Sequence, residues 1–193
     1  MTPVFQHMGT LLSFVLAFSV SHQLFAVVEI VRAKDRVKQS VVHSLWMANC
    51  FLAVVSWWIG FWDLREITQW PVIVVLALLA GVIALFLAVA FVSPRIPPAG
   101  SLDLWQFHLD NRRKYLTPLL SALFIAVVVS LYYGNVQSLP NQNIQAIIFA
   151  CMILAGLVAF FSPNAMAQRI AAVAYFAGAV LYFAVGDPML VSN

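Results

Sequence analysis

Ionisable and polar side chains are scarce in the apolar stretches of this sequence, so those that occur there are the first candidates for chemistry. Ser19, His22 and Glu29 are spaced by three and then seven residues, which places them along one stripe of a helix. An imidazole with an ordinary pKa of about 6.5 exchanges protons near neutral pH, and a carboxylate does so at lower pH. The stripe therefore predicts a polar pathway that exchanges protons.

A second apolar stretch carries polar groups that fit the same pathway. Asn49 and Ser56 share a helix face through their seven-residue separation, and helix rise places Asn49 at a depth similar to that of His22. We expect these two residues to meet, with Glu29 and His43 at the inner mouth of the pathway. The alternative is structural: His22 bonds to Asn49 or a serine and holds two helices together, while Glu29 pairs with a nearby arginine.

The composition indicates what must position these residues. The 193 residues are 63% hydrophobic and only 9% charged, with a formal net charge of +3. A soluble domain carries about 25% charged residues. Soluble enzymes and nucleic-acid-binding domains are therefore excluded, and an all-α integral membrane protein is expected, with residues 1–193 as a single transmembrane domain.

Six stretches are long and apolar enough to cross a bilayer, which takes about 20 residues of helix. Pro118 is expected in the opening turn of the fourth span, and the third span, which has no polar side chain, is expected to face lipid. The predicted spans are residues 9–31, 41–62, 71–92, 116–133, 144–161 and 166–185.

Orientation follows from the ten lysine and arginine residues. Nine lie in or beside the first, third and fifth loops, and only Arg65 lies in the second. Basic residues accumulate in cytoplasmic loops, so we expect the odd-numbered loops in the cytoplasm and both termini outside. Short loops and a strong charge bias are typical of a bacterial inner (plasma) membrane. The nine residues are Arg32, Lys34, Arg36, Lys38, Arg95, Arg112, Arg113, Lys114 and Arg169.

The third loop is long enough to contain structure of its own. Ser101 is a suitable N-cap for a short amphipathic helix over residues 101–115. We expect this helix to lie in the cytoplasmic interface, where Arg112, Arg113 and Lys114 approach the headgroups of anionic lipids.

Catalytic and cofactor-binding motifs are missing from the sequence. It has no HExxH, GxSxG, CxxC or phosphate-binding glycine loop, and no potassium-filter motif. A bis-histidine haem needs two imidazoles at one depth, but His22 and His43 differ by about 10 Å in helix rise, and His108 is expected outside the spans. We therefore expect no cofactor, no metal, no nucleic-acid partner and no enzymatic activity.

Two functions from different classes remain. The first is a small channel or proton-linked transporter that works as an oligomer, because the polar stripe lies in a chain without room for a soluble catalytic domain. The second is a non-transporting accessory or scaffold subunit of a larger membrane complex, because most of the few polar residues have adequate structural explanations. Ion flux into proteoliposomes distinguishes the two.

Overall fold

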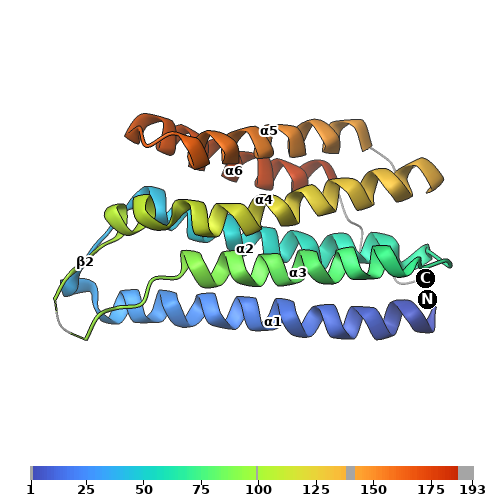
Figure 1. Ribbon diagram of the computed structural model, residues 1–193, viewed down its shortest axis with the longest axis horizontal. Helices are drawn as coiled ribbons and strands as arrows, with labels where there is room; N and C mark the ends of the chain where they lie inside the picture. The colour runs from blue at the N-terminus through green and yellow to red at the C-terminus, as the bar shows by residue number, and fades with distance from the viewer. Residues whose placement is uncertain (1, 99, 138–141, 187–193) are drawn as a thin grey trace.

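The computed structural model describes residues 2–98, 100–137 and 142–186, and it is a bundle of six long helices (Figure 1). All six are long and apolar enough to cross a membrane, so the prediction of a multi-pass all-α membrane protein with six spans is confirmed. The helices are α1 (Pro3–Arg32), α2 (Val41–Trp62), α3 (Val72–Val92), α4 (Leu104–Gln137), α5 (Gln142–Phe161) and α6 (Ala165–Gly186).

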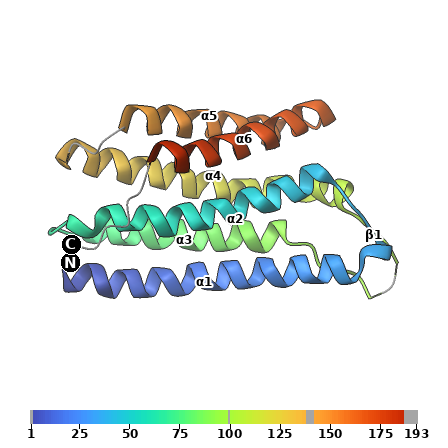
Figure 2. The ribbon, with the colours of Figure 1, turned by 180° about the vertical axis from the view of Figure 1, so that it is seen from behind.

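Successive helices run in opposite directions along the bundle, which gives it two distinct ends (Figures 1 and 2). We call the end where α1 finishes and α2 begins the basic end, since the predicted cytoplasmic residues gather there. The other end, where α1 begins and α6 finishes, is called the terminal end and carries the short 3-10 helix η2 (Asp63–Glu66). We predicted that both termini lie on the extracellular side. Part of that prediction concerns residues 1 and 187–193, which are not among the described residues.

Helix α3 is buried on one side and exposes Ile73, Leu76 and Phe91 on the other, so the expectation that it faces lipid describes only one of its sides. It packs against α1, α2 and α4, while α1 forms one edge of the bundle and the α5–α6 hairpin the other (Figure 1). Val82, Leu85 and Val89 of α3 are almost fully buried. An apolar helix suits lipid and protein surroundings equally, so the lack of polar side chains did not decide its position.

The fourth span differs most from its prediction. Residues 104–115 are helical, but they continue without interruption into the span as the 34-residue helix α4, so no separate interfacial helix exists. Pro118 therefore lies inside α4 rather than in its opening turn. The N-terminal cap is Asp103 instead of Ser101, because Asp103 Oδ1 accepts from the backbone N–H groups of Trp105 and Gln106.

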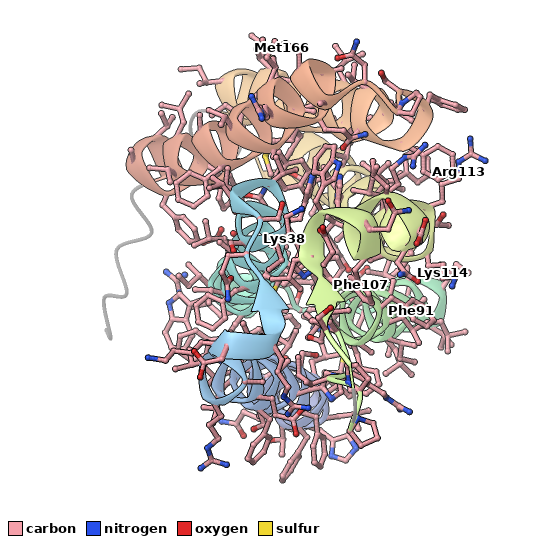
Figure 3. The ribbon with its side chains drawn as sticks, turned by 90° about the vertical axis from the view of Figure 1, so that its left-hand side faces the viewer. Lys38, Phe91, Phe107, Arg113, Lys114 and Met166 are labelled. Carbon is pink, nitrogen blue, oxygen red and sulfur yellow. The ribbon has the colours of Figure 1, made fainter. Side chains whose placement is uncertain are left out.

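Two short strands join the loops at the basic end. Strand β1 (Val37–Lys38), which follows the 3-10 helix η1 (Lys34–Arg36), pairs in parallel with β2 (Leu102–Asp103). Lys38 Nζ lies 2.9 Å from Asp103 Oδ2. The lysine ammonium lowers the pKa of the Asp103 carboxyl below its ordinary value, and the carboxylate raises the pKa of Lys38. Figure 3 views the bundle from this end, with Lys38 on β1 beside β2.

Candidate functional site

The stripe predicted on α1 does not line the interior of the bundle. His22 and Glu29 are exposed on the surface of α1, and Ser19 is buried, with its hydroxyl donating to the Val15 carbonyl. His22 lies beside Phe86 of α3, with ring centroids 6.3 Å apart. In the single chain these groups therefore face lipid or another protein.

The expected meeting of His22 and Asn49 does not occur. Asn49 is fully buried, and its Nδ2 donates to the Ala172 carbonyl of α6 at 3.1 Å. The link between α1 and α2 is formed instead by Gln23, whose Nε2 donates to the Met47 carbonyl. Helix rise gives the depth of a residue but not the direction in which its side chain points. The rotation of α1 about its axis turns Gln23 inward and its neighbour His22 outward.

His43 is fully buried in the first turn of α2, whereas we predicted it at an open inner mouth. Its ring meets Phe107 of α4 edge-on, with centroids 5.3 Å apart and planes at 87°. Neither ring nitrogen has a hydrogen-bond partner among the described residues. His43 also interacts electrostatically with His108 of α4, so two buried imidazoles approach one another near the basic end.

His108 is at the centre of a buried hydrogen-bonded group that the sequence did not predict. Its Nδ1 lies 2.6 Å from the hydroxyl of Tyr115, and its Nε2 lies 2.9 Å from Oε1 of Gln168 on α6. Nε2 of Gln168 donates to the carbonyls of Ala159, at 2.7 Å, and Ser162. His108, Tyr115 and Gln168 each have no exposed surface. We call these three residues, together with His43, the inner polar cluster.

The two carbonyls determine the direction of every hydrogen bond in this chain of groups. They accept both amide hydrogens of Gln168, which leaves Oε1 facing His108; because an amide oxygen only accepts, His108 Nε2 must carry a proton. Nδ1 of neutral His108 then accepts from the Tyr115 hydroxyl. If His108 gains a second proton, Nδ1 becomes a donor, so the Tyr115 hydroxyl must turn its hydrogen away and accept through its oxygen.

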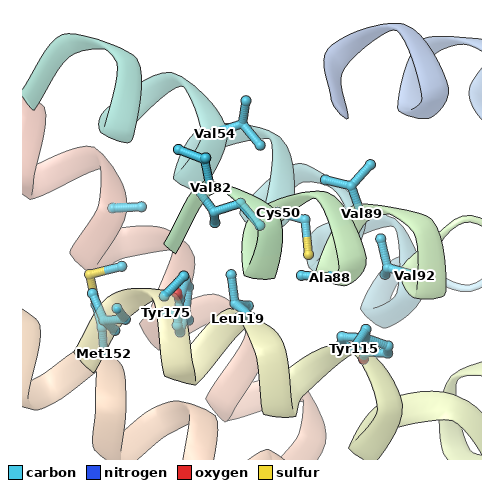
Figure 4. Packing of buried hydrophobic residues seen from close by; sticks show 14 of the residues in the cluster. Cys50, Val54, Val82, Ala88, Val89, Val92, Tyr115, Leu119, Met152 and Tyr175 are labelled. Carbon is cyan, nitrogen blue, oxygen red and sulfur yellow. The ribbon is translucent and has the colours of Figure 1, made fainter. Parts of the chain in front are cut away.

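Three aromatic rings extend from the inner polar cluster, of which Tyr115 is a member, to Tyr175 of α6. Trp46 of α2 lies between Tyr115 and Tyr175, at centroid distances of 6.1 and 5.4 Å. Both Trp46 and Tyr115 are fully buried, and Tyr175 is 1% exposed. We call these three residues the aromatic layer. Figure 4 shows Tyr115 and Tyr175 in the interior, with Leu119 between them.

A cavity of about 130 Å³ lies on the other side of the aromatic layer. Its lining extends from Tyr175, in the interior, to Asp63, which is exposed at the terminal end. Ser56, one of the predicted pathway residues, lines this cavity and donates its hydroxyl hydrogen to the Leu52 carbonyl at 2.7 Å. The cavity, the aromatic layer and the inner polar cluster therefore follow one another along the bundle.

Three helices carry this arrangement on stripes with helical spacing. Helix α6 presents Gln168, Tyr175 and Tyr182, each seven residues from the last, which corresponds to steps of about 10 Å. The same seven-residue spacing relates His43, Cys50 and Trp57 on α2, and His108 and Tyr115 on α4. This seven-residue spacing of polar and aromatic residues is the sequence signal that would have identified the site.

The predicted headgroup-binding residues lie near the basic end of α4. Arg113 and Lys114 are exposed, and the Arg113 guanidinium carbon lies 5.5 Å from the centroid of the Phe160 ring (Figure 3). Arg112 is half-buried and donates to the Leu109 carbonyl at 2.7 Å. Two of the three cations are thus directed outward from the helix.

Comparison with protein-family models, with curated proteins and with solved structures finds no match to this chain. Within the described residues, no three His, Cys, Asp or Glu side chains are grouped to bind a metal ion. We excluded a bis-histidine haem partly because His108 was predicted to lie outside the spans. That predicted location was wrong, because His108 lies inside α4 and close to His43.

Proposed function

We propose that this protein is a small proton-linked transporter that works as an oligomer. The observation that supports this proposal is the alignment of a cavity, an aromatic barrier and a buried histidine cluster along one axis of the bundle. Buried ionisable groups inside a membrane domain are costly, and they mark ion and substrate pathways in many such proteins.

In this proposal the cavity admits a solute from the terminal end, and the aromatic layer blocks its passage. Protonation of His108 reverses the hydrogen bond with Tyr115, because Nδ1 changes from acceptor to donor and the hydroxyl hydrogen must rotate away. Tyr115 contacts Trp46, and Trp46 contacts Tyr175 at the inner wall of the cavity. A proton at His108 is thus communicated through ring contacts to the site where the solute binds.

We further place the basic end in the cytoplasm of a bacterial inner membrane, as the distribution of lysine and arginine predicts. Exposed Arg113 and Lys114 would then approach anionic headgroups, with Arg112 beside them. The solute would enter from outside the cell and meet the proton-binding groups nearer the cytoplasm.

The oligomer would form through the exposed surface of α1. His22 and Glu29 are exposed there, and a second copy would remove these polar groups from contact with lipid. A polar pathway through His22, as the sequence suggested, would in this case lie between subunits. The number of subunits, measured by native mass spectrometry, tests this part of the proposal. A strictly monomeric protein in lipid nanodiscs would contradict it.

Proton flux in proteoliposomes tests the transport proposal. We reconstitute the purified protein in vesicles loaded with a pH-sensitive dye. When a potassium diffusion potential is imposed, we expect the interior of these vesicles to become acidic. His108→Gln keeps an amide that can bond to Tyr115 and Gln168 but cannot titrate, so we expect it to reduce flux at least tenfold.

The matched control is His7→Gln, which changes an exposed histidine in the first turns of α1 and should leave flux unchanged. Flux equal to that of empty vesicles, or a His108→Gln protein with the flux and pH profile of wild type, would refute the mechanism.

The accessory-subunit alternative is favoured by the same exposed side chains of α1. His22 and Glu29 would then be covered by a different membrane protein, and the cavity would have no transport role. Absence of flux together with a stoichiometric partner, purified from native membranes through a tag on this chain, would support this function instead.

A further inference from the structure

The lining of the cavity points to a chemical class of ligand. We infer that it binds a small hydrophobic organic cation, such as a quaternary ammonium compound, and this inference rests on the proposed function for its role as a transported substrate.

Aromatic side chains form much of the cavity wall. Rings of this kind attract cations through the negative charge on their faces, and aromatic cages are a recurrent way of binding quaternary ammonium groups. They also remove the apolar parts of a ligand from water. The six aromatic lining residues are Trp57, Phe61, Tyr133, Phe149, Tyr175 and Tyr182.

The charge on the cavity lining is negative. Asp63 is the one charged side chain among the described residues that line the cavity, and no lysine, arginine or histidine is among them. Its carboxylate also interacts electrostatically with the hydroxyl of Tyr182, which belongs to the same wall. A carboxylate beside aromatic rings attracts a cation and repels an anion.

Arg65 interacts electrostatically with the Asp63 carboxylate, but it does not line the cavity. Its Nη1 donates to the Trp62 carbonyl at 3.2 Å, and its guanidinium carbon lies 5.5 Å from the centroid of the Trp62 ring. A positively charged ligand inside the cavity would therefore approach Asp63 from the lined side without displacing a lining cation.

The wall also carries polar groups suited to a ligand. The Tyr133 hydroxyl is buried and has no hydrogen-bond partner in the part of the chain that the structure describes. Ser130 and Gln145 line the same cavity. A few polar groups set in an apolar wall are typical of small-molecule sites, where they orient a ligand that is held mainly by apolar contact.

Equilibrium binding of radiolabelled benzyltrimethylammonium to the full-length protein in lipid nanodiscs tests this inference. We expect saturable binding, and we expect Asp63→Asn to weaken it about tenfold through loss of the charge interaction. Asp35→Asn is the matched control, because Asp35 is exposed at the opposite, basic end. Thermal unfolding of each variant verifies that the fold is retained.

Two competitors separate charge from hydrophobic contact. Neopentylbenzene has the same shape without the charge and should compete at least tenfold less well, whereas benzenesulfonate carries the opposite charge and should not compete. Absence of saturable binding, unchanged affinity in Asp63→Asn, or equal competition by benzenesulfonate would overturn the inference.

The outcome is separable from that of the transport proposal. Cation binding without proton flux would leave this site standing and refute the transport mechanism. Proton flux that depends on His108, without cation binding, would do the reverse.

Discussion

Replacing Gln168 with methionine tests the inner polar cluster most directly. The side chain makes three hydrogen bonds: one with His108 Nε2 and two to the carbonyls of Ala159 and Ser162. Methionine has a similar volume and shape, so the packing penalty is small and the loss of polar contacts dominates. The substitution leaves one buried ring nitrogen and two buried carbonyls without these partners.

The expected magnitude follows from the number of bonds. Interhelical hydrogen bonds in membrane proteins contribute about 0.6 kcal/mol on average and at most about 1.7 kcal/mol each. Three bonds therefore correspond to about 2 kcal/mol and no more than about 5 kcal/mol. For a chain of this size, 2 kcal/mol lowers Tm by roughly 4–8 °C.

The assay is thermal unfolding in detergent followed by circular dichroism, with Gln6→Met as the control. Gln6 is exposed on α1, and its replacement should change the free energy of unfolding by less than about 0.5 kcal/mol. A Gln168→Met protein with the Tm of wild type would refute the stabilising role of these bonds.

A double-mutant cycle with Tyr115→Phe then tests whether the groups act as a unit. Both residues bond to the same imidazole, so their effects should deviate from additivity by more than about 0.5 kcal/mol. Additive effects would mean that the two bonds to His108 are independent, and the coupling proposed for transport would lose its basis.

Three further predictions concern other parts of the molecule. Asp103→Ala should lower Tm by a few degrees, because it removes both the cap of α4 and the ion pair with Lys38. Because the pKa of Asp103 is lowered in the folded protein, the contribution of this pair is present above the unfolded pKa of about 3.9, and it decreases as the pH falls toward the folded pKa. Gly81→Ala should destabilise the protein by about 1–3 kcal/mol and weaken ligand binding, because a Cβ there would lie 2.0 Å from Cη2 of Trp57, a cavity residue. A cysteine in place of Arg36 should react with a membrane-impermeant maleimide only after cells are opened.

Each of these has a matched control. Lys38→Ala removes the ion pair but leaves the cap, so it should lower Tm less than Asp103→Ala; an equal loss would contradict the capping role. Gly60→Ala meets only the Tyr182 hydroxyl at 3.4 Å and should be tolerated, in contrast to Gly81→Ala. Thr68→Cys at the terminal end should react in intact cells, and the reverse labelling pattern would invert the predicted orientation.

Hydropathy predicted the helices well because it is a local property. The bounds of α2 match the prediction at both ends, and those of α3, α5 and α6 lie within two residues of it. Helix α4 was shortened in the prediction because Arg112, Arg113 and Lys114 interrupt the apolar pattern. The structure continues the helix through them, because the two exposed cations reach beyond the bundle and Arg112 bonds to its own helix.

The composition and periodicity of this chain determined that it crosses a membrane six times, because the length and apolarity required to span a bilayer are properties of each segment alone. They did not determine which side of each helix faces inward. Lipid and protein interior are both apolar, so the rotation of α1 that exposes His22 and buries Gln23 carries no hydropathy signal. Only the packing of α2, α4 and α6 brought His108, Gln168 and Trp46 into one interior, because residues from three separate helices meet only when the helices are in contact.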